Sequence, residues 1–267
     1  MSRLPMLIVN ADDWGGSAAL TDAIDACFIR GAITSATAMM FMTDSRRAAE
    51  LALARQYPIG LHLNLTQPLA APETPPMVRE RQLQACAHFA SLRRRRLLIS
   101  PNPRVHTLIA DCIRDQLDEF HERYGCQPTH LDSHHHVHTS PDVFLSRAIA
   151  RGSLVRQTIS PSPRPVAPLE RLDLALLIGR ARHELLYRLF TTTDRLWRPA
   201  EVYSGRGAVT IETAARAARS EAVEMMVHLQ HQPERELLYS DHWAASLANA
   251  RLASYEDLGA ALTPRYS

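Results

Sequence analysis

The chain has 267 residues, of which 46% are hydrophobic and 22% are charged, and its formal net charge is +2. This length and composition allow a substantial core within one domain, so a second domain is not required. A net charge so close to zero gives no global indication of a nucleic-acid or acidic partner. We therefore expect no nucleic-acid partner, and function must be sought in a local site.

The first quarter of the sequence alternates between apolar runs and helical patterns. Apolar runs at Met6–Ala11, Ile33–Met40 and Ile59–Leu65 predict buried strands. Helical patterns at Ser17–Gly31, with a serine cap and a closing glycine, and at Asp44–Gln56 separate these runs. The order strand, helix, strand, helix, strand predicts a parallel sheet with crossover helices.

Residues 67–104 interrupt this alternation. A proline-rich loop is followed by a charged helix that contains Arg93–Arg96. We expect this segment to be a lid insertion over the mouth of a barrel. We interpret the arginine run as a solvated helix face rather than as a contact for a phosphate or an anionic lipid-linked sugar.

The remaining sequence contains weaker patterns and no internal repeat. It predicts, in order, a helix at 105–124, a strand at 129–133, a helix that starts at Pro141, a strand at 154–159, a proline-rich loop at 160–168, a helix at 169–190, a strand at 222–229 and a helix at 246–262.

The four cysteines are spread through the sequence without a CxxC pair: Cys27, Cys86, Cys112 and Cys126. This spacing favours buried reduced thiols over disulfides or metal ligands. The apolar run near the N-terminus is too short for a signal peptide, and no segment approaches the roughly 20 apolar residues of a membrane span. We therefore expect a cytoplasmic protein without a membrane span, and the sequence leaves a homodimer open.

Polar side chains stand near the carboxyl ends of three predicted strands. Asp12 and Asp13 follow the first strand, His62 lies in the third, and the histidine-rich run 134–138 follows the strand at 129–133. In parallel α/β architectures such strand ends converge on one face. We therefore expect these residues to share a site.

The types of these residues favour a metal site. Adjacent carboxylates in a partly desolvated place repel one another unless a cation compensates them, although Asp12 or Asp13 alone could equally cap the following helix. A lone His62 among leucines would indicate a packed core histidine. Four imidazoles within five residues, beside Asp132, instead favour metal binding, and a shell of two histidines and one carboxylate leaves positions open for water and substrate.

Four ordered motifs, NADDWG (10–15), GAITSATAMM (31–40), GLHLNLT (60–66) and PTHLDSHHHVH (128–138), closely resemble the YdjC-like carbohydrate deacetylases. This chito-oligosaccharide deacetylase family includes a hopanoid-associated group, and the similarity covers about the first 160 residues. The resemblance implies one domain over residues 1–267 with a distorted (β/α) barrel related to polysaccharide deacetylases. It also implies metal-dependent hydrolysis of an N-acetyl group from an amino sugar, with release of acetate.

The resemblance also implies roles for individual residues. By motif position, Asp13, His62 and His134 would hold one divalent metal ion, Mg²⁺ or Zn²⁺, and this donor set also suits Co²⁺, Mn²⁺ or Ni²⁺. Asp12 would be the general base. His228, in the late segment MMVHLQ, is the candidate general acid.

Five further residues are candidates for contact with the substrate or for support of the metal ligands: Asn64, Thr66, Asp132, His138 and Arg156. Asn64 and Thr66 are expected to fix His62, because metal-binding histidines generally need such partners. For Arg156, ordinary ion pairing is favoured over contact with an anionic substrate group.

The sequence departs from the family pattern at two places. Leu229 and Gln230 follow His228 where the family shows Pro-Gly, which puts the turn that presents His228 in doubt. Trp14 replaces the usual phenylalanine after the aspartates, and we expect it on the floor of the site.

Two other functions stay open on the sequence alone. One is a different mononuclear metal hydrolase on a similar barrel; dinuclear enzymes often bridge their ions with a modified lysine, and this chain has no lysine. The other is a non-catalytic metal-binding protein, which would bind the ion without turnover. Metal content measured together with acetate release separates these possibilities.

Overall fold

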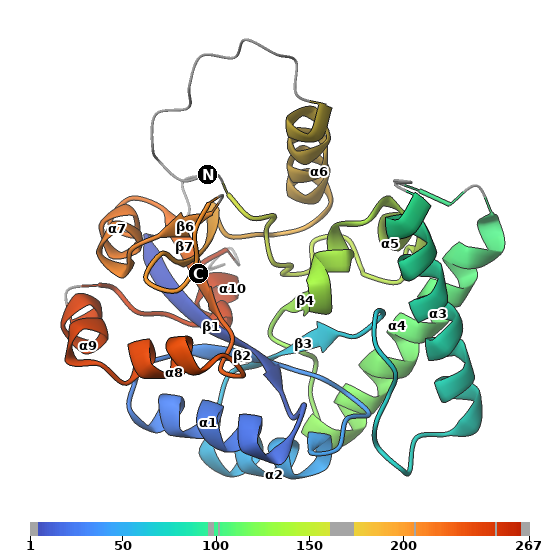
Figure 1. The fold of residues 1–267 in the computed structure, drawn as a ribbon, viewed down its shortest axis with the longest axis horizontal. Coiled ribbons are helices and arrows are strands. Elements are labelled where there is room, and N and C mark those ends of the chain that lie inside the picture. The colour runs from blue at the N-terminus through green and yellow to red at the C-terminus, as the bar shows by residue number, and fades with distance from the viewer. Residues whose placement is uncertain are drawn as a thin grey trace, which may run out of the picture.

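The computed structural model describes residues 5–95, 99–100, 102–160, 174–205, 207–248 and 250–262. Their strands form one parallel sheet in the order β4-β3-β2-β1-β7-β5-β6 (Figure 1). The strands are β1 (Met6–Trp14), β2 (Ser35–Ala38), β3 (Ile59–Leu63), β4 (Leu131–Ser133), β5 (Arg195–Pro199), β6 (Ala208–Val209) and β7 (Ala222–Val227).

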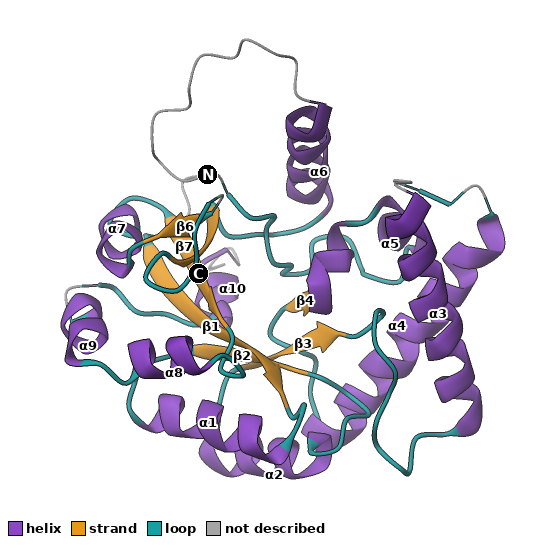
Figure 2. Cartoon of the chain, in the orientation of Figure 1, coloured by secondary structure: helices purple, strands orange, loops and turns teal. Residues whose placement is uncertain are grey.

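Helices surround this sheet (Figure 2). They are α1 (Ala18–Ile29), α2 (Ser45–Arg55), α3 (Pro76–Arg95), α4 (Pro103–Tyr124), α5 (Pro141–Ser146), α6 (Leu174–Leu189), α7 (Ile211–Ala217), α8 (Gln232–Leu238), α9 (Asp241–Leu247), α10 (Tyr255–Leu262) and the 3₁₀ helix η1 (His134–Thr139). The expected cap is present, since the Ser17 side chain accepts from the Leu20 N–H. Gly125 ends α4 with φ 68°, a conformation that favours glycine.

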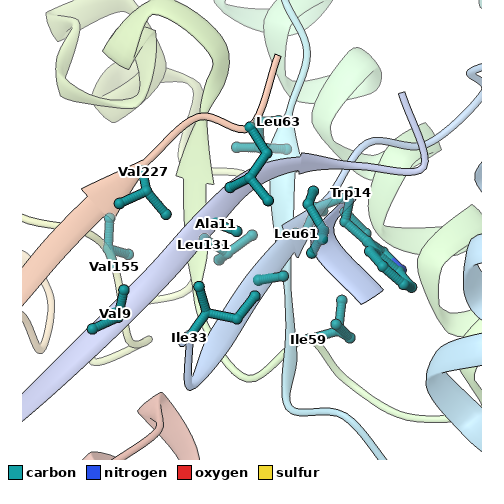
Figure 3. Close-up of a cluster of buried hydrophobic side chains, with 14 of the residues drawn as sticks. Val9, Ala11, Trp14, Ile33, Ile59, Leu61, Leu63, Leu131, Val155 and Val227 are labelled. Atoms are coloured by element: carbon teal, nitrogen blue, oxygen red, sulfur yellow. The ribbon is translucent and has the colours of Figure 1, made fainter. Parts of the chain in front are cut away.

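Side chains alternate between the two faces of each strand, and the face toward the helices carries the main core. Val9 and Ala11 of β1, Leu61 of β3 and Val227 of β7 are fully buried there (Figure 3). Trp14 joins this core, where its Nε1–H donates to the Ala48 carbonyl oxygen. The expectation that Trp14 lies on the floor of the site is therefore wrong.

The opposite face of the sheet, called here the inner face, is apolar only at the amino ends of the strands. Met6 and Ile8 pack there against Tyr255 and Leu258 of α10. The Tyr255 ring also stacks on His130, with ring centroids 3.6 Å apart. Helix α10 therefore closes this end of the inner face, and the alternation leaves Asn10 and Asp12 on the same face at the carboxyl ends.

An extended segment, 154–160, connects the two sides of the sheet. The Leu131 N–H donates to the Leu154 carbonyl and the Arg156 N–H to the Leu131 carbonyl, both at 2.9 Å. At the far end the Ser160 N–H donates to the Leu196 carbonyl of β5, also at 2.9 Å. The parallel sheet thus curls into a distorted half-barrel, which confirms the expected fold class.

Several expected elements differ from the structure. The strand expected at 154–159 forms only isolated bridges at Leu154 and Val155, because the Thr158 N–H bonds to the Gln157 side chain instead of a neighbouring strand. The helix expected at 246–262 is wrong; the structure has α9 and α10 with a connection between them. Helices α7 and α8 and strands β5 and β6 were not expected. Part of the loop at 160–168 and the start of the helix at 169–190 lie outside the described residues.

Helix α3 occupies most of the expected insertion at 67–104 and packs beside α4. Together with η1 and α6 it lines a cavity of about 370 Å³ next to the histidine run. Arg93 and Arg94 are exposed, as expected for a solvated face, whereas Arg96 lies outside the described residues. The lid role and the single-domain organisation stay predictions.

The described cysteines are all free, in agreement with reduced thiols. Cys27 and Cys112 are buried as expected and Cys86 is partly buried, but Cys126 is exposed, since it lies in the turn after α4. Among the helices that the structure describes, none is long and apolar enough to cross a membrane.

Leu61→Ala is expected to lower the free energy of unfolding by about 2–5 kcal/mol, because it leaves a cavity in the main core. Leu61 is fully buried, whereas Leu53 on α2 is 52% exposed. For the control Leu53→Ala, urea unfolding should therefore show a loss in the free energy of unfolding of at most about 0.5 kcal/mol. Equal losses in the two variants would contradict this assignment of the core.

Candidate metal centre

Strand register places the expected site residues beside one another. Parallel pairing of β3 with β4 sets His62 opposite Asp132. Pairing of β1 with β7 sets Ala11 opposite Val227, so the next residues, Asp12 and His228, are neighbours at the carboxyl ends of these strands.

Asp13 leaves the regular geometry of β1. Its φ is 67°, which is uncommon outside glycine, and the register with β2 shifts between Ala11 and Trp14. The bulge turns the Asp13 carboxylate toward two imidazoles: Oδ1 lies 3.1 Å from His62 Nε2 and 3.2 Å from His134 Nδ1. The three residues predicted as metal ligands therefore meet, with their ligand atoms all within 4.8 Å of one another.

This donor set fits a divalent ion. It offers two imidazole nitrogens and one carboxylate oxygen, and His62 Nδ1 is held by Asp132 Oδ1 at 2.7 Å and lies 3.2 Å from the Thr37 hydroxyl. A carboxylate on the far ring nitrogen is the usual partner of a metal-binding histidine, because it orients the ring.

The pKa shifts of Asp13 and His62, two of the predicted metal ligands, show that the carboxylates and imidazoles stabilise one another's charged forms. Burial alone would raise the pKa of the Asp13 carboxyl, but His62 and His134 hold it well below its usual range. Burial would lower the pKa of His62, yet Asp132 and Asp13 raise it well above its ordinary value. An ion that enters the site must therefore displace a proton from His62.

Arg156 is the centre of a buried ion network. Its guanidinium is fully buried and reaches Asp12 Oδ1 at 2.6 Å, Asp132 Oδ2 at 2.6 Å and Glu224 Oε1 at 2.8 Å. Glu224 in turn accepts from the Tyr255 hydroxyl. The favoured expectation of ion pairing for Arg156 agrees with these contacts.

Asp12 lies beside the three predicted metal ligands and is not one of them. Each of its two oxygens accepts a hydrogen bond from one terminal nitrogen of Arg156, and Oδ1 also accepts one from the Asn10 side-chain amide. Although burial raises the pKa of Asp12, the charge of Arg156 and then that of His62 lower it well below its usual range. Asp12 is therefore ionised at neutral pH, and its Oδ2 lies 3.5 Å from His228 Nε2.

His228 is anchored from the side away from Asp12. Its backbone N–H donates to Glu234 Oε2 at 2.7 Å, and the Tyr203 hydroxyl donates to the other oxygen of Glu234. Burial lowers the pKa of His228 and raises that of Glu234 to about 7. The departure from the Pro-Gly pattern after His228 therefore still leaves this imidazole beside Asp12.

Both ring nitrogens of His138 contact groups other than the predicted metal ligands. Its ring lies between the Ser133 hydroxyl, 2.8 Å from Nδ1, and the Arg156 carbonyl, 3.1 Å from Nε2. The ring is fully buried, which holds its pKa well below the ordinary value. His138 is therefore neutral and ties η1 to the segment that carries Arg156.

Asn64 and Thr66 contact groups other than His62 among the described residues. Asn64 lies beyond the end of β3, where its side-chain oxygen accepts from the N–H groups of Thr66 and Gln67. The Thr66 hydroxyl is 3.0 Å from His135 Nδ1. The expected fixing of His62 is instead performed by Asp132 and Thr37.

Sequence reasoning did not single out several residues of this site: Asn10, Thr37, Tyr203, Glu224 and Glu234. Glu224 had a signal, because it is the only charged residue within the apolar strand β7 and is fully buried. A charged residue inside such a strand needs a buried partner. The others depend on register and loop packing, which leave no local pattern.

The fold and site define a class: a parallel α/β half-barrel with a histidine and carboxylate cluster at the carboxyl ends of its strands. The chain belongs to the YdjC-like protein family, whose model matches residues 6–256.

Individual relatives agree with this assignment. The chain is 38% identical over 145 residues to a carbohydrate deacetylase of Geobacillus stearothermophilus, covering 51% of this chain and 52% of that one. It is 35% identical over 144 residues to a chitooligosaccharide deacetylase of Serratia marcescens, covering 52% and 53%. The matches thus span about half the length of these curated relatives.

A crystal structure from Enterococcus faecalis, described as a candidate cellobiose-phosphate cleavage protein, has the same fold. Its TM-score is 0.68 at 23% identity, and the superposition covers 96% of this chain and 99% of that one.

Arg156→Met is expected to destabilise the protein by about 3–5 kcal/mol, because it leaves buried carboxylates without their cation. The control is Arg195→Met, since Arg195 pairs with Glu221 at 40% and 34% exposure. That surface pair contributes about 0–1 kcal/mol. Urea unfolding of the metal-stripped proteins measures the loss of stability in both variants. A loss for Arg156→Met as small as that for Arg195→Met would contradict the central role of Arg156.

Glu234→Gln is expected to change how stability depends on pH. The pKa of Glu234 is raised to about 7 by burial, from an ordinary value of 4.5. The protonated carboxyl therefore stabilises the fold below the ordinary value, and this contribution is lost as pH rises through 7. Between about pH 5 and pH 8 the wild-type protein should lose stability relative to Glu234→Gln, by at most about 1.4 kcal/mol per pH unit. The measurement is urea unfolding of the two metal-stripped proteins as a function of pH. If the free energies of unfolding of the wild type and Glu234→Gln change in parallel over this range, the prediction is wrong.

Proposed function

We propose that this protein is a metal-dependent carbohydrate deacetylase, which hydrolyses the N-acetyl group of an amino sugar and releases acetate. The observation that carries the proposal is the convergence of Asp13, His62 and His134 next to Asp12, an ionised carboxylate outside that cluster. The names of the relatives, carbohydrate deacetylase and chitooligosaccharide deacetylase, support this substrate class.

Asp13, His62 and His134 are the proposed ligands of one divalent ion. Two imidazoles and one carboxylate suit Zn²⁺, Co²⁺, Mn²⁺ or Ni²⁺, and Mg²⁺ is the alternative among harder ions. When bound, such an ion supplies a Lewis acid for the amide carbonyl and lowers the pKa of the attacking water.

Asp12 is the proposed general base. Its low pKa keeps it ionised but makes it a weak base, so it depends on a water that is already acidified. Oδ1 is engaged by Arg156 and Asn10, whereas Oδ2 has Arg156 and the more distant His228, so Oδ2 has room to take the proton. The two Arg156 contacts also fix the plane of this carboxylate.

His228 is the proposed general acid. Its lowered pKa leaves the imidazole neutral, so it must first acquire a proton. Nε2 faces Asp12 Oδ2 at 3.5 Å, and in this proposal the proton that Asp12 takes from water passes to Nε2 and from there to the departing nitrogen. A C–O bond to the water oxygen forms, the C–N bond breaks, and the products are acetate and the free amino sugar.

Acetate release from N-acetylglucosamine oligomers tests this proposal. Metal-stripped protein is assayed with and without added Zn²⁺, Co²⁺ or Mg²⁺, and activity is expected only with metal. His134→Ala should lose both metal binding and activity, whereas Asp12→Asn should keep metal binding and lose at least about 100-fold in kcat. His121→Ala, on the exposed surface of α4, is the control.

The outcomes separate the competing functions. Bound metal without acetate release from any acetylated amino sugar would favour a non-catalytic metal-binding protein. Metal-dependent hydrolysis of phosphate esters in its place would favour another mononuclear hydrolase. Full activity of His134→Ala would refute the ligand assignment.

A further inference from the structure

The turn after β7 presents two side chains on one side. The His231 N–H donates to the His228 carbonyl at 3.2 Å, which closes a four-residue turn with Leu229 and Gln230 at its centre. Leu229 is fully buried in the main core, whereas Gln230 is exposed at the site. The buried Leu229 therefore anchors the turn, and the side chains of His228 and Gln230 on either side of it extend toward the carboxylates of β1.

These two polar residues engage the two adjacent aspartates separately. His228 Nε2 lies 3.5 Å from Asp12 Oδ2, and Gln230 Nε2 donates to Asp13 Oδ2 at 3.1 Å. A metal-binding carboxylate is ionised and can only accept hydrogen bonds. The amide of Gln230 must therefore present its nitrogen, which settles the orientation of the side chain.

The hydrogen bond from Gln230 makes the two oxygens of Asp13 unequal. Oδ1 faces His62 Nε2 and His134 Nδ1, whereas Oδ2 is held by the amide. A carboxylate without such a partner could rotate or offer both oxygens to an ion. Here only Oδ1 points between the two imidazoles.

We infer that Gln230 is a positioning residue of the metal centre, which restricts Asp13 to binding the ion through Oδ1 alone. This inference rests on the metal site of the proposed function. Binding through one oxygen keeps the number of protein ligand atoms at three, which leaves positions open for water and for the substrate carbonyl. The same turn therefore orders the metal ligand and delivers His228 to Asp12.

The chain offers a matched control close by. Gln232, two residues later, carries the same amide, but it is exposed and bonds to Glu236 one helical turn away. Its removal leaves the carboxylates of β1 untouched. Gln230→Met keeps the side-chain length without the donor, and Gln230→Ala removes both.

Titration of the metal-stripped full chain with Co²⁺, followed by visible absorption, tests the inference. Gln230→Ala and Gln230→Met are expected to bind Co²⁺ about 10-fold or more weakly, as is usual when the partner of a metal ligand is lost. The absorption of bound Co²⁺ should also fall, because entry of the second oxygen raises the coordination number. Gln232→Ala should match the wild type, and urea unfolding without metal should show all three variants folded.

Wild-type affinity and an unchanged Co²⁺ spectrum in Gln230→Met would overturn the inference. If the wild-type protein itself binds no Co²⁺, the proposed metal site and this inference are both wrong. If the wild-type protein binds Co²⁺ and the Gln230 variants differ as expected, the inference holds even where no acetate is released, and only the proposed reaction fails.

Discussion

The fully buried guanidinium of Arg156 is the interaction on which the rest of the inner face depends. It joins Asp12 of β1, Asp132 of β4 and Glu224 of β7, three strands that are far apart in the sequence. Without this cation the carboxylates would repel one another in a region from which water is excluded. The proposed divalent ion would displace the proton of His62, and Arg156 and that ion would then together bring three positive charges to the carboxylates of Asp12, Asp13 and Asp132.

Strand order explains how much of the site could be predicted from the sequence. The apolar runs ending at Asp12, His62 and His134 sufficed to predict that these residues meet, because parallel strands bring their carboxyl ends to one edge. The ligand atoms of Asp13, His62 and His134 do lie within 4.8 Å of one another. Their roles in binding and catalysis stay predictions.

The parts that the sequence did not predict depend on tertiary register. Asp13 reaches the imidazoles of His62 and His134 only through a β-bulge at which its φ is positive, and no residue pattern in the sequence predicts that bulge. The sequence predicts that Asn64, on the same strand segment, fixes the His62 ring. In the structure the residue that does so is Asp132, on the neighbouring strand β4. Likewise the segment at 154–159 has the composition of a strand, yet it forms only isolated bridges at Leu154 and Val155, and the Thr158 N–H bonds to the Gln157 side chain.

Helix α10 supports the arginine network from the opposite end of the half-barrel, so the site cannot be separated from this helix without loss of contacts. Tyr255 stacks on His130 beneath the inner face and donates to Glu224, which in turn holds Arg156. The carboxylates at one end of the barrel are thus tied to a helix at the other end through a continuous line of buried contacts. Grafting residues 6–228 onto another scaffold would transfer each proposed ligand and each proposed proton carrier, but it would remove Tyr255 and so leave Glu224 without the hydroxyl that supports its contact with Arg156.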